Sequence, residues 1–329
     1  MRAIVCSELG PPERLKLETL SDVLPGPGQV LVAVEAAGVN FPDTLIIEGK
    51  YQIKPEVPFS PGGELSGVVK CVGADVEGFA PGDPVMAMTA YGAFREEVVV
   101  NASVLMKRPT SMDAVVAAGF TMTYGTSMHA LKQRAGLRPG ETLLVLGAGG
   151  GVGLAAVEIG KAIGARVIAA ASSAEKLAAA RAAGADELVN YSEQSLKDRV
   201  KELTGGSGAD VVYDPVGGEL FEQALRATAW EGRVLVVGFA SGMIPKPPVN
   251  LALLKGCSIV GVFFGGFHAR QPDDNRRNFD ELFEFHKAGL LKPLIDHTMP
   301  LERAAEALRL VSERKVIGKI VLLMGNAER

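Results

Sequence analysis

Apolar and polar positions follow two different patterns on either side of residue 115. In the first part, short runs rich in β-branched residues are separated by Pro and Gly, which predicts β-strands joined by turns. In the second part, Ala-rich segments alternate with short apolar runs, and this order predicts a parallel sheet with helices on both faces. The early strands are predicted at 28–39, 66–76, 83–89 and 93–100.

The alternating region supplies six predicted strands and four predicted helices. The strands are expected at 142–147, 166–171, 187–190, 209–213, 232–238 and 257–264, and the helices at 151–163, 174–183, 195–204 and 218–228. After Gly265 a polar segment at 268–278 precedes a helix at 279–290. A proline-led helix at 300–315 and a strand at 318–324 are predicted to follow.

The stretch from Thr142 to Lys161 joins an apolar strand to an Ala-rich helix through a glycine-rich turn. Glycines let the backbone approach phosphates, and the helix N-terminus presents free N–H groups and a positive dipole end. The glycines are spaced as Gly147, Gly150 and Gly153, a variant of the usual dinucleotide fingerprint. A plain strand–helix connection is the alternative, and the flanking strand and helix favour a dinucleotide site. The expected contacts are Gly150, Gly151 and Val152.

The end of the second strand of this region carries Ala171, Ser172 and Ser173, where NAD sites place an acidic residue. A carboxylate there would repel a 2′-phosphate, whereas small hydroxyl side chains followed by Lys176 suit one. Tyr191, after the third strand, is expected to close the same pocket. The alternative is that a serine only caps the helix and that Lys176 is solvated. We therefore predict NADPH rather than NADH as the cofactor.

Composition limits the classes of function that remain. With 329 residues the chain is long enough for two domains, and its 47% hydrophobic and 22% charged residues are typical of globular proteins. A net charge of −4 disfavours nucleic acid as a partner. Without a recognisable targeting signal or an apolar run of 18 residues, we expect no membrane association and a cytoplasmic location. The three isolated cysteines fit buried thiols.

Several motifs besides the glycine turn occur in a recognisable order along nearly the whole chain. They are GVNFPD (38–43), PFSPGGELSG (58–67), AGFTMTYGTSMHAL (118–131), VVYDPVGG (211–218), VVGF (236–239) and LLKGCSIVGVFFG (253–265). In this order they resemble the medium-chain dehydrogenase/reductase superfamily, and within it the zinc-free quinone oxidoreductases related to zeta-crystallin. The turn matches the quinone-reductase form, with Glu158 where the family usually carries Gln.

The resemblance implies an α/β fold in which a Rossmann doubly wound parallel sheet is combined with a GroES-like, β-rich catalytic domain. The catalytic domain is expected to be discontinuous, covering 1–121 and 265–329, with the Rossmann dinucleotide-binding domain at 122–264. The strand at 259–264 is expected at the edge of the sheet, where a second copy of the chain can pair. The resemblance therefore implies a homodimer.

The resemblance also bears on metal binding. In zinc alcohol dehydrogenases of the superfamily, a Cys and a His of the first domain hold a catalytic metal. Here Asn40 stands in the position of the Cys and Gly63 in that of the His, and neither is a zinc ligand. The run of four cysteines that binds a structural zinc is also missing from the sequence. We expect no metal and no metal-assisted alcohol oxidation.

What remains is hydride transfer from a nicotinamide to an electron-poor acceptor, and we predict an NADPH-dependent reductase of quinones. One alternative is the reduction of α,β-unsaturated ketones or enoyl thioesters. Another is a nucleic-acid-binding or structural role without turnover, as in some crystallin relatives. Asn40 is expected to donate to the acceptor oxygen and Tyr51 to donate a hydrogen bond or a proton. Their alternatives are a turn-stabilising asparagine and a packing tyrosine. The residues expected near the nicotinamide are Asn40, Tyr51, Thr126, Gly238, Phe239 and Phe264.

Overall fold

The computed structural model describes residues 1–325 and divides into two compact units. Unit 1 holds residues 1–122 and the chain from Leu294 onward, and unit 2 holds residues 123–293. The first division lies one residue from the boundary expected after residue 121. The second differs from the expectation, because residues 265–293 belong to unit 2 and not to the first domain. Their helices pack on the helical segment at 129–134, and Gln133 Nε2 donates to Asn278 Oδ1 over 2.9 Å.

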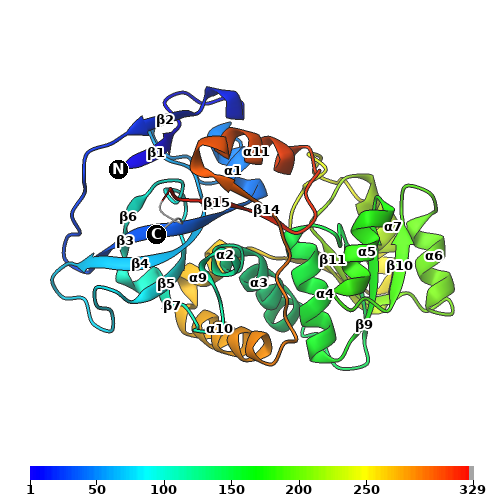
Figure 1. The fold of residues 1–329 in the computed structure, drawn as a ribbon. Coiled ribbons are helices and arrows are strands. Elements are labelled where there is room, and N and C mark those ends of the chain that lie inside the picture. The colour runs from blue at the N-terminus through cyan, green and yellow to red at the C-terminus, as the bar shows by residue number, and fades with distance from the viewer. Residues whose placement is uncertain (326–329) are drawn as a thin grey trace. The chain divides into compact units, whose positions relative to one another are not determined.

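Unit 1 is built around a seven-stranded sheet whose central strand is β3 (Gln29–Val39). β3 is apolar and buried along most of its length, and the strand pairs with β4, β6 and β15. Figure 1 shows the red C-terminal strand β15 returning beside β3, as the register confirms. The sheet order is β14 (Ile295–Pro300), β15 (Lys319–Leu323), β3, β4 (Glu64–Val72), β5 (Pro84–Met88) and β7 (Leu105–Lys107), with β6 (Glu97–Asn101) also on β3.

Short elements complete unit 1. Strands β1 (Arg2–Val5) and β2 (Lys16–Thr19) form a separate antiparallel pair. The α-helices are α1 (Phe41–Ile47), α2 (Ala114–Ala118) and α11 (Ala304–Ser312), and the 3₁₀ turns are η1 (Pro12–Arg14), η2 (Ala102–Val104) and η4 (Leu301–Arg303). The chain passes into unit 2 within α3 (Thr121–Met128).

Unit 2 contains a six-stranded parallel sheet in the order β10, β9, β8, β11, β12, β13. The chain starts in the centre at β8, moves outward to β10, and then returns to the other side of β8, so that the strand order reverses between β8 and β11. This is the doubly wound Rossmann order, and ligands bind at the carboxyl ends of the strands where the order reverses. The strands are β8 (Thr142–Leu146), β9 (Arg166–Ala171), β10 (Glu187–Asn190), β11 (Ala209–Asp214), β12 (Thr228–Val236) and β13 (Ser258–Gly261).

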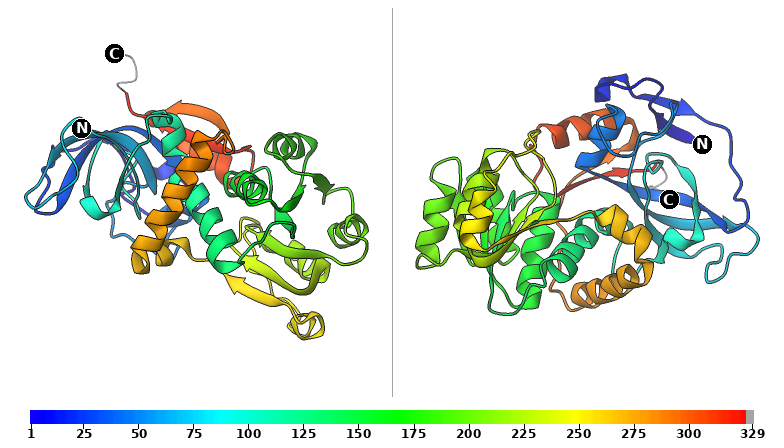
Figure 2. Two further views of the ribbon diagram at one scale, coloured as in Figure 1. Left: turned by 90° about the horizontal axis from the view of Figure 1, so that it is seen from below. Right: turned by 180° about the vertical axis from the view of Figure 1, so that it is seen from behind.

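The helices of unit 2 follow the predicted alternation up to β12. They are α4 (Gly151–Ile163), α5 (Ala174–Ala182), α6 (Leu196–Leu203), α7 (Glu219–Ala227) and α8 (Asn250–Lys255). A π-helical turn, η3 (His129–Arg134), continues α3, and α9 (Phe264–Arg270) and α10 (Pro272–Lys287) follow the sheet. In Figure 2 the orange α10 lies alongside the green helices that begin unit 2. The mixed α/β fold class is thus confirmed.

Two local expectations about the end of the sheet were wrong. The strand expected at 257–264 stops at Gly261, and the polar segment expected at 268–278 is helical. Phe264 opens α9 instead of ending a strand, and its ring is buried against Gly125 of α3. Burial of this ring is a tertiary effect, which an apolar run alone does not reveal because a short run fits either element.

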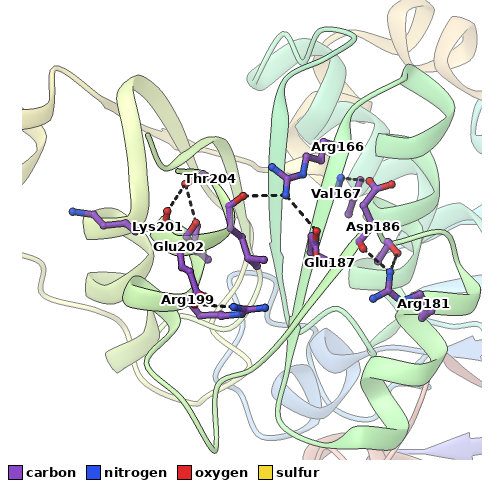
Figure 3. A network of polar contacts seen from close by, with 12 residues as sticks. Arg166, Val167, Arg181, Asp186, Glu187, Arg199, Lys201, Glu202 and Thr204 are labelled. Carbon is purple, nitrogen blue, oxygen red and sulfur yellow. Dashed lines mark hydrogen bonds and ion pairs between the residues drawn. The ribbon is translucent and has the colours of Figure 1, made fainter. Parts of the chain in front are cut away.

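A network of polar contacts stabilises the edge of the unit 2 sheet at β10 (Figure 3). Arg166 lies near Glu187 at 3.4 Å, and the Val167 N–H donates to the carboxylate of Asp186 over 2.7 Å. Arg181 of α5 donates to the carbonyl of Asp186. Strand β10 has only four residues, and these contacts supplement its short ladder with β9.

Candidate functional site

The glycine-rich turn lies at the carboxyl end of β8, beside the point where the strand order reverses. Gly147 has a φ of +58°, a conformation that glycine adopts without strain. A Cβ at Gly153 would overlap the carbonyl oxygen of Gly147, so only glycine permits this packing of the helix on the turn. Gly150 precedes the first turn of α4, whose N-terminal N–H groups face out of the helix end. These are the features that a pyrophosphate requires.

The residues expected to bind a 2′-phosphate come together at the ends of β9 and β10. Asn190 pairs with Ala171, and the Tyr191 N–H donates to the Ala171 carbonyl over 3.2 Å. Ser172 is exposed, and its carbonyl accepts a hydrogen bond from Ser192 Oγ. No carboxylate occupies positions 171–173, because the residues there are alanine and serine.

Helix α5 brings Lys176 to the glycine-rich turn. A Cβ added at Gly149 would lie 2.5 Å from the Cβ of Lys176, so the two backbones are in close contact. Ser173 caps α5, because its hydroxyl oxygen accepts the Lys176 N–H at 3.4 Å. Helix capping by one of the two serines was the alternative to phosphate binding. Ser172 and the half-buried Lys176 therefore lie near the glycine-rich turn, whereas the Ser173 side chain caps α5.

The other predicted contacts of unit 2 form two groups. Thr126 of α3 is half-buried and follows Gly125, against which the ring of Phe264 packs. Gly238 and Phe239 lie on the loop after β12. The Gly238 N–H donates to the Asp214 carbonyl over 3.3 Å, and Phe239 Cδ1 would lie 2.9 Å from a Cβ at Gly217. The second group thus adjoins the end of β11.

Asp214 was not singled out from the sequence, yet it shapes this part of the site. Its Oδ1 accepts the N–H groups of Val216 at 2.8 Å and Gly217 at 2.9 Å, which fixes the loop after β11. The Val216 side chain contacts the position of a Cβ at Gly147, so the same loop packs on the glycine turn. Burial raises the pKa of Asp214 to about 6. The sequence signal that could have pointed to Asp214 is an acidic residue directly before a proline at the end of a predicted strand.

Unit 1 contains a buried polar cluster made of Asn40, Glu64, Thr121 and Lys319. Glu64 Oε1 accepts from Lys319 Nζ at 2.7 Å and from Asn40 Nδ2 at 2.9 Å. Its Oε2 accepts from Thr121 Oγ1 and from the Met122 N–H, both at 2.8 Å. Each carboxylate oxygen of this fully buried residue therefore has two donors.

Lys319 completes the cluster with all three of its ammonium protons. Besides Glu64, it donates to Asn40 Oδ1 at 2.7 Å and to the Val39 carbonyl at 3.0 Å. Only 5% of Lys319 is exposed, which is rare for a lysine and requires such pairing. Neither Glu64 nor Lys319 was expected in the site, although both lie in motifs that are visible in the sequence, GGELSG and GKIVLLM.

The cluster bears directly on the role expected for Asn40. Its Oδ1 accepts from Lys319, while its Nδ2 donates to Glu64 and more weakly to the Gly38 carbonyl at 3.4 Å. The Asn40 N–H donates to Asp43 Oδ2 over 2.8 Å, which helps to start α1. The amide thus has internal partners at both ends, and its donation to an acceptor oxygen stays a prediction.

Tyr51 is half-buried on the loop after α1 and packs against the core of unit 1. Burial and the nearby charge of Asp43 raise the pKa of Tyr51, which keeps its hydroxyl protonated as a donor. Burial raises the pKa of Asp43 itself to about 7. A Cβ at Gly63 would lie 3.5 Å from Asp43 Oδ1, so Asp43 also adjoins the position that holds a histidine in zinc enzymes of the superfamily.

Residues 1–325 contain no group of three or more His, Cys, Asp or Glu side chains arranged to hold a metal ion. None of the helices in this range is long and apolar enough to cross a bilayer.

Comparison with known proteins agrees with both units. Residues 26–110 match the model of the alcohol dehydrogenase GroES-like domain, and residues 151–284 match that of the zinc-binding dehydrogenases. A quinone oxidoreductase-like protein 2 homolog of Nematostella vectensis is 42% identical over 98% of this chain and 88% of its own length.

Solved structures give the same result. A mycobacterial protein crystallised with NADPH is 33% identical, with a TM-score of 0.91 over 98% of this chain and 99% of its own. The quinone oxidoreductase of Escherichia coli in complex with NADPH is 29% identical, with a TM-score of 0.92 over 98% and 100% of the two chains. Fold and site thus define an oxidoreductase with a GroES-like and a Rossmann domain. The chain belongs to the medium-chain dehydrogenase/reductase superfamily, as a member of the quinone oxidoreductase type.

Proposed function

We propose that this protein is an NADPH-dependent, zinc-independent reductase that transfers a hydride to a quinone. The observation that carries the proposal is the glycine-rich turn close to Ser172 and Lys176, with no carboxylate at positions 171–173 at the end of β9. Relatives named quinone oxidoreductases and a relative crystallised with NADPH support it.

The residues of unit 2 fit the cofactor. The N-terminus of α4, from Gly150 to Val152, would bind the pyrophosphate, while Ser172, Lys176 and Tyr191 would bind the 2′-phosphate. Thr126, Gly238, Phe239 and Phe264 are the proposed walls around the nicotinamide. NADPH would supply the hydride, and the chain's own residues would bind it, orient it and exclude water.

Zinc independence is proposed from the residues that replace the metal ligands. Asn40 is an amide engaged by Lys319 and Glu64, and Gly63 has no side chain. A Cβ at Gly63 would lie 2.8 Å from the terminal methyl of Met122, so any side chain at position 63 would require the Met122 side chain to move. Without a Lewis acid to lower an alcohol's pKa, an acceptor that is already electron-poor is the fitting substrate.

The proposal is tested by following NADPH oxidation by the purified protein with a panel of quinones, enones and enoyl thioesters, and repeating the series with NADH. Turnover of quinones with NADPH, unchanged by a chelator, is the expected result. Binding of NADPH without oxidation by any member of the panel would contradict an enzymatic role.

Lys176→Ala is expected to raise the KM for NADPH by about 10–100-fold, because a charge-assisted hydrogen bond to the 2′-phosphate contributes roughly 1.5–3 kcal/mol. The KM for NADH should stay unchanged, since NADH lacks that phosphate. Lys201→Ala, which removes an exposed lysine of α6, is the matched control. Equal effects on NADPH and NADH would contradict the phosphate site.

Enone or enoyl-thioester reduction is the second candidate, for which the hydroxyl of the half-buried Tyr51 would serve as the acid. There the hydride goes to the β-carbon and an acid must protonate the α-carbon, whereas a reduced quinone can take protons from water. Tyr51→Phe should lower kcat for enones by about 100-fold and leave quinone turnover within a few-fold. Steady-state rates on both acceptors measure this, and full enone activity would exclude a proton-donor role for Tyr51.

We also propose a homodimer formed at the edge of the unit 2 sheet. Strand β13 is an edge strand, and an unpaired edge can add a strand from a second copy. Large hydrophobic side chains are exposed on and next to the edge: Trp230, Leu253, Leu254, Ile259 and Phe263. Apolar side chains gathered in this way are typical of an interface. Sedimentation as a single species of 34.5 kDa would contradict the dimer.

A further inference from the structure

Glu158 is a buried carboxylate of α4 that the proposed reaction leaves without a role. It is 6% exposed, and its Oε2 accepts the Tyr124 hydroxyl at 2.7 Å and the Lys292 N–H at 3.1 Å. Burial and the adjacent carboxylate raise the pKa of Tyr124 far above its ordinary value, so Tyr124 is the donor of this bond.

A second hydrogen bond also joins α3 to α4. One helical turn beyond Tyr124, Ser127 Oγ donates to the Val152 carbonyl over 3.0 Å, and it also lies 3.0 Å from the Tyr213 hydroxyl of β11. Val152 and Glu158 are about 9 Å apart along α4 at the usual helical rise. Two contacts at this separation fix both the distance and the angle between the helices.

These two helices carry proposed contacts to different parts of the cofactor. The pyrophosphate contacts are at the start of α4, whereas Thr126, between Tyr124 and Ser127, is a proposed nicotinamide contact. We propose that Glu158 is a positioning residue, which holds α3 through Tyr124 and thereby sets the span between the pyrophosphate turn and Thr126. The inference rests on the proposed function, because it assumes that NADPH occupies this site.

The carboxylate suits this position because both of its partners there are donors. A glutamine keeps one acceptor oxygen of the same reach, so Glu158→Gln is the conservative variant. Glu158→Ala removes the acceptor, and Tyr124→Phe removes the donor while keeping the ring that packs at this place. Both are expected to loosen α3 without touching the phosphate-binding residues.

The test measures the affinity of the full-length protein for two probes, NADPH and adenosine 2′,5′-bisphosphate. The second probe covers only the end of the site formed by the glycine turn, Ser172 and Lys176. Tyr124→Phe and Glu158→Ala should weaken NADPH binding about 10-fold, the loss expected for one hydrogen bond to a charged group. They should leave the affinity for the bisphosphate unchanged, and Glu158→Gln should restore most of the affinity for NADPH.

Each outcome separates the inference from the proposed function. If both variants weaken the two probes equally, Glu158 serves only stability and the inference is wrong. It is equally wrong if NADPH affinity does not change in Tyr124→Phe. If the unaltered protein binds neither probe, the proposed function fails first. Glu202→Gln, an exposed carboxylate of α6, is the matched control and should change neither affinity.

Discussion

Lys319→Met is expected to lower the free energy of unfolding by about 3–5 kcal/mol, the cost of leaving a buried carboxylate without its partner. Glu64 is fully buried, and the substitution removes one of its four donors, Lys319. It also removes the contact of Lys319 with Asn40 Oδ1, which helps to orient a second donor, Asn40 Nδ2. Methionine fills a similar volume, so the loss reports the charge and its hydrogen bonds more than the packing. Chemical denaturation of the two proteins at neutral pH measures the difference.

Two further variants identify the cause of that loss. Lys319→Met combined with Glu64→Gln removes both charges, and it should recover part of the stability because no buried charge is left unpaired. Lys70→Met breaks an exposed ion pair with Glu97 in the same unit and should barely move the denaturation midpoint. A midpoint for Lys319→Met that equals that of Lys70→Met would contradict the structural importance of the cluster.

Gly153→Ala should have the largest effect on the cofactor site. The added methyl group would overlap the Gly147 carbonyl and lie 2.8 Å from Ala148 Cα, and both are backbone atoms that cannot turn aside. The turn must therefore shift relative to α4. We expect a loss of about 1–3 kcal/mol in stability from overpacking. We also expect a fall of about 100-fold in kcat/KM for NADPH, the scale of a misplaced binding group.

Gly261→Ala is the control for that variant. A Cβ at Gly261 meets nothing within 4 Å, and its φ is not in the left-handed region, so the substitution tests the loss of a glycine without a collision. Thermal unfolding and NADPH titration of both variants give the comparison. If Gly153→Ala binds NADPH as tightly as Gly261→Ala does, the turn does not hold the pyrophosphate in the way proposed.

Much of unit 2 could be predicted because its signals are local. The helix expected at 151–163 is α4 with the same bounds, and the strands at 166–171 and 187–190 are likewise β9 and β10. An apolar run followed by glycines and an alanine-rich segment specifies strand, turn and helix within about 20 residues. The identity of residues 171–173 can likewise be read directly from the sequence.

The segment that follows Gly261 shows where local signals end. Its apolar residues fit a strand or a buried helix equally well, and the choice depends on Gly125, more than 130 residues earlier, which leaves room for the Phe264 ring. The same packing places 265–293 in unit 2. Periodicity carries no information about a partner so distant in the chain.

The sequence by itself determined the alternation of strands and helices between residues 142 and 238, the glycine turn, and the side chains that replace an acidic residue and the two metal ligands. Only the tertiary structure decided that Asn40 is bound at both ends by Lys319 and Glu64. Those residues meet because β15 pairs with β3, and β3 in turn pairs with β4. A buried charge is stable only with its partners in place, and which partners are near is a property of the folded sheet and not of any one segment.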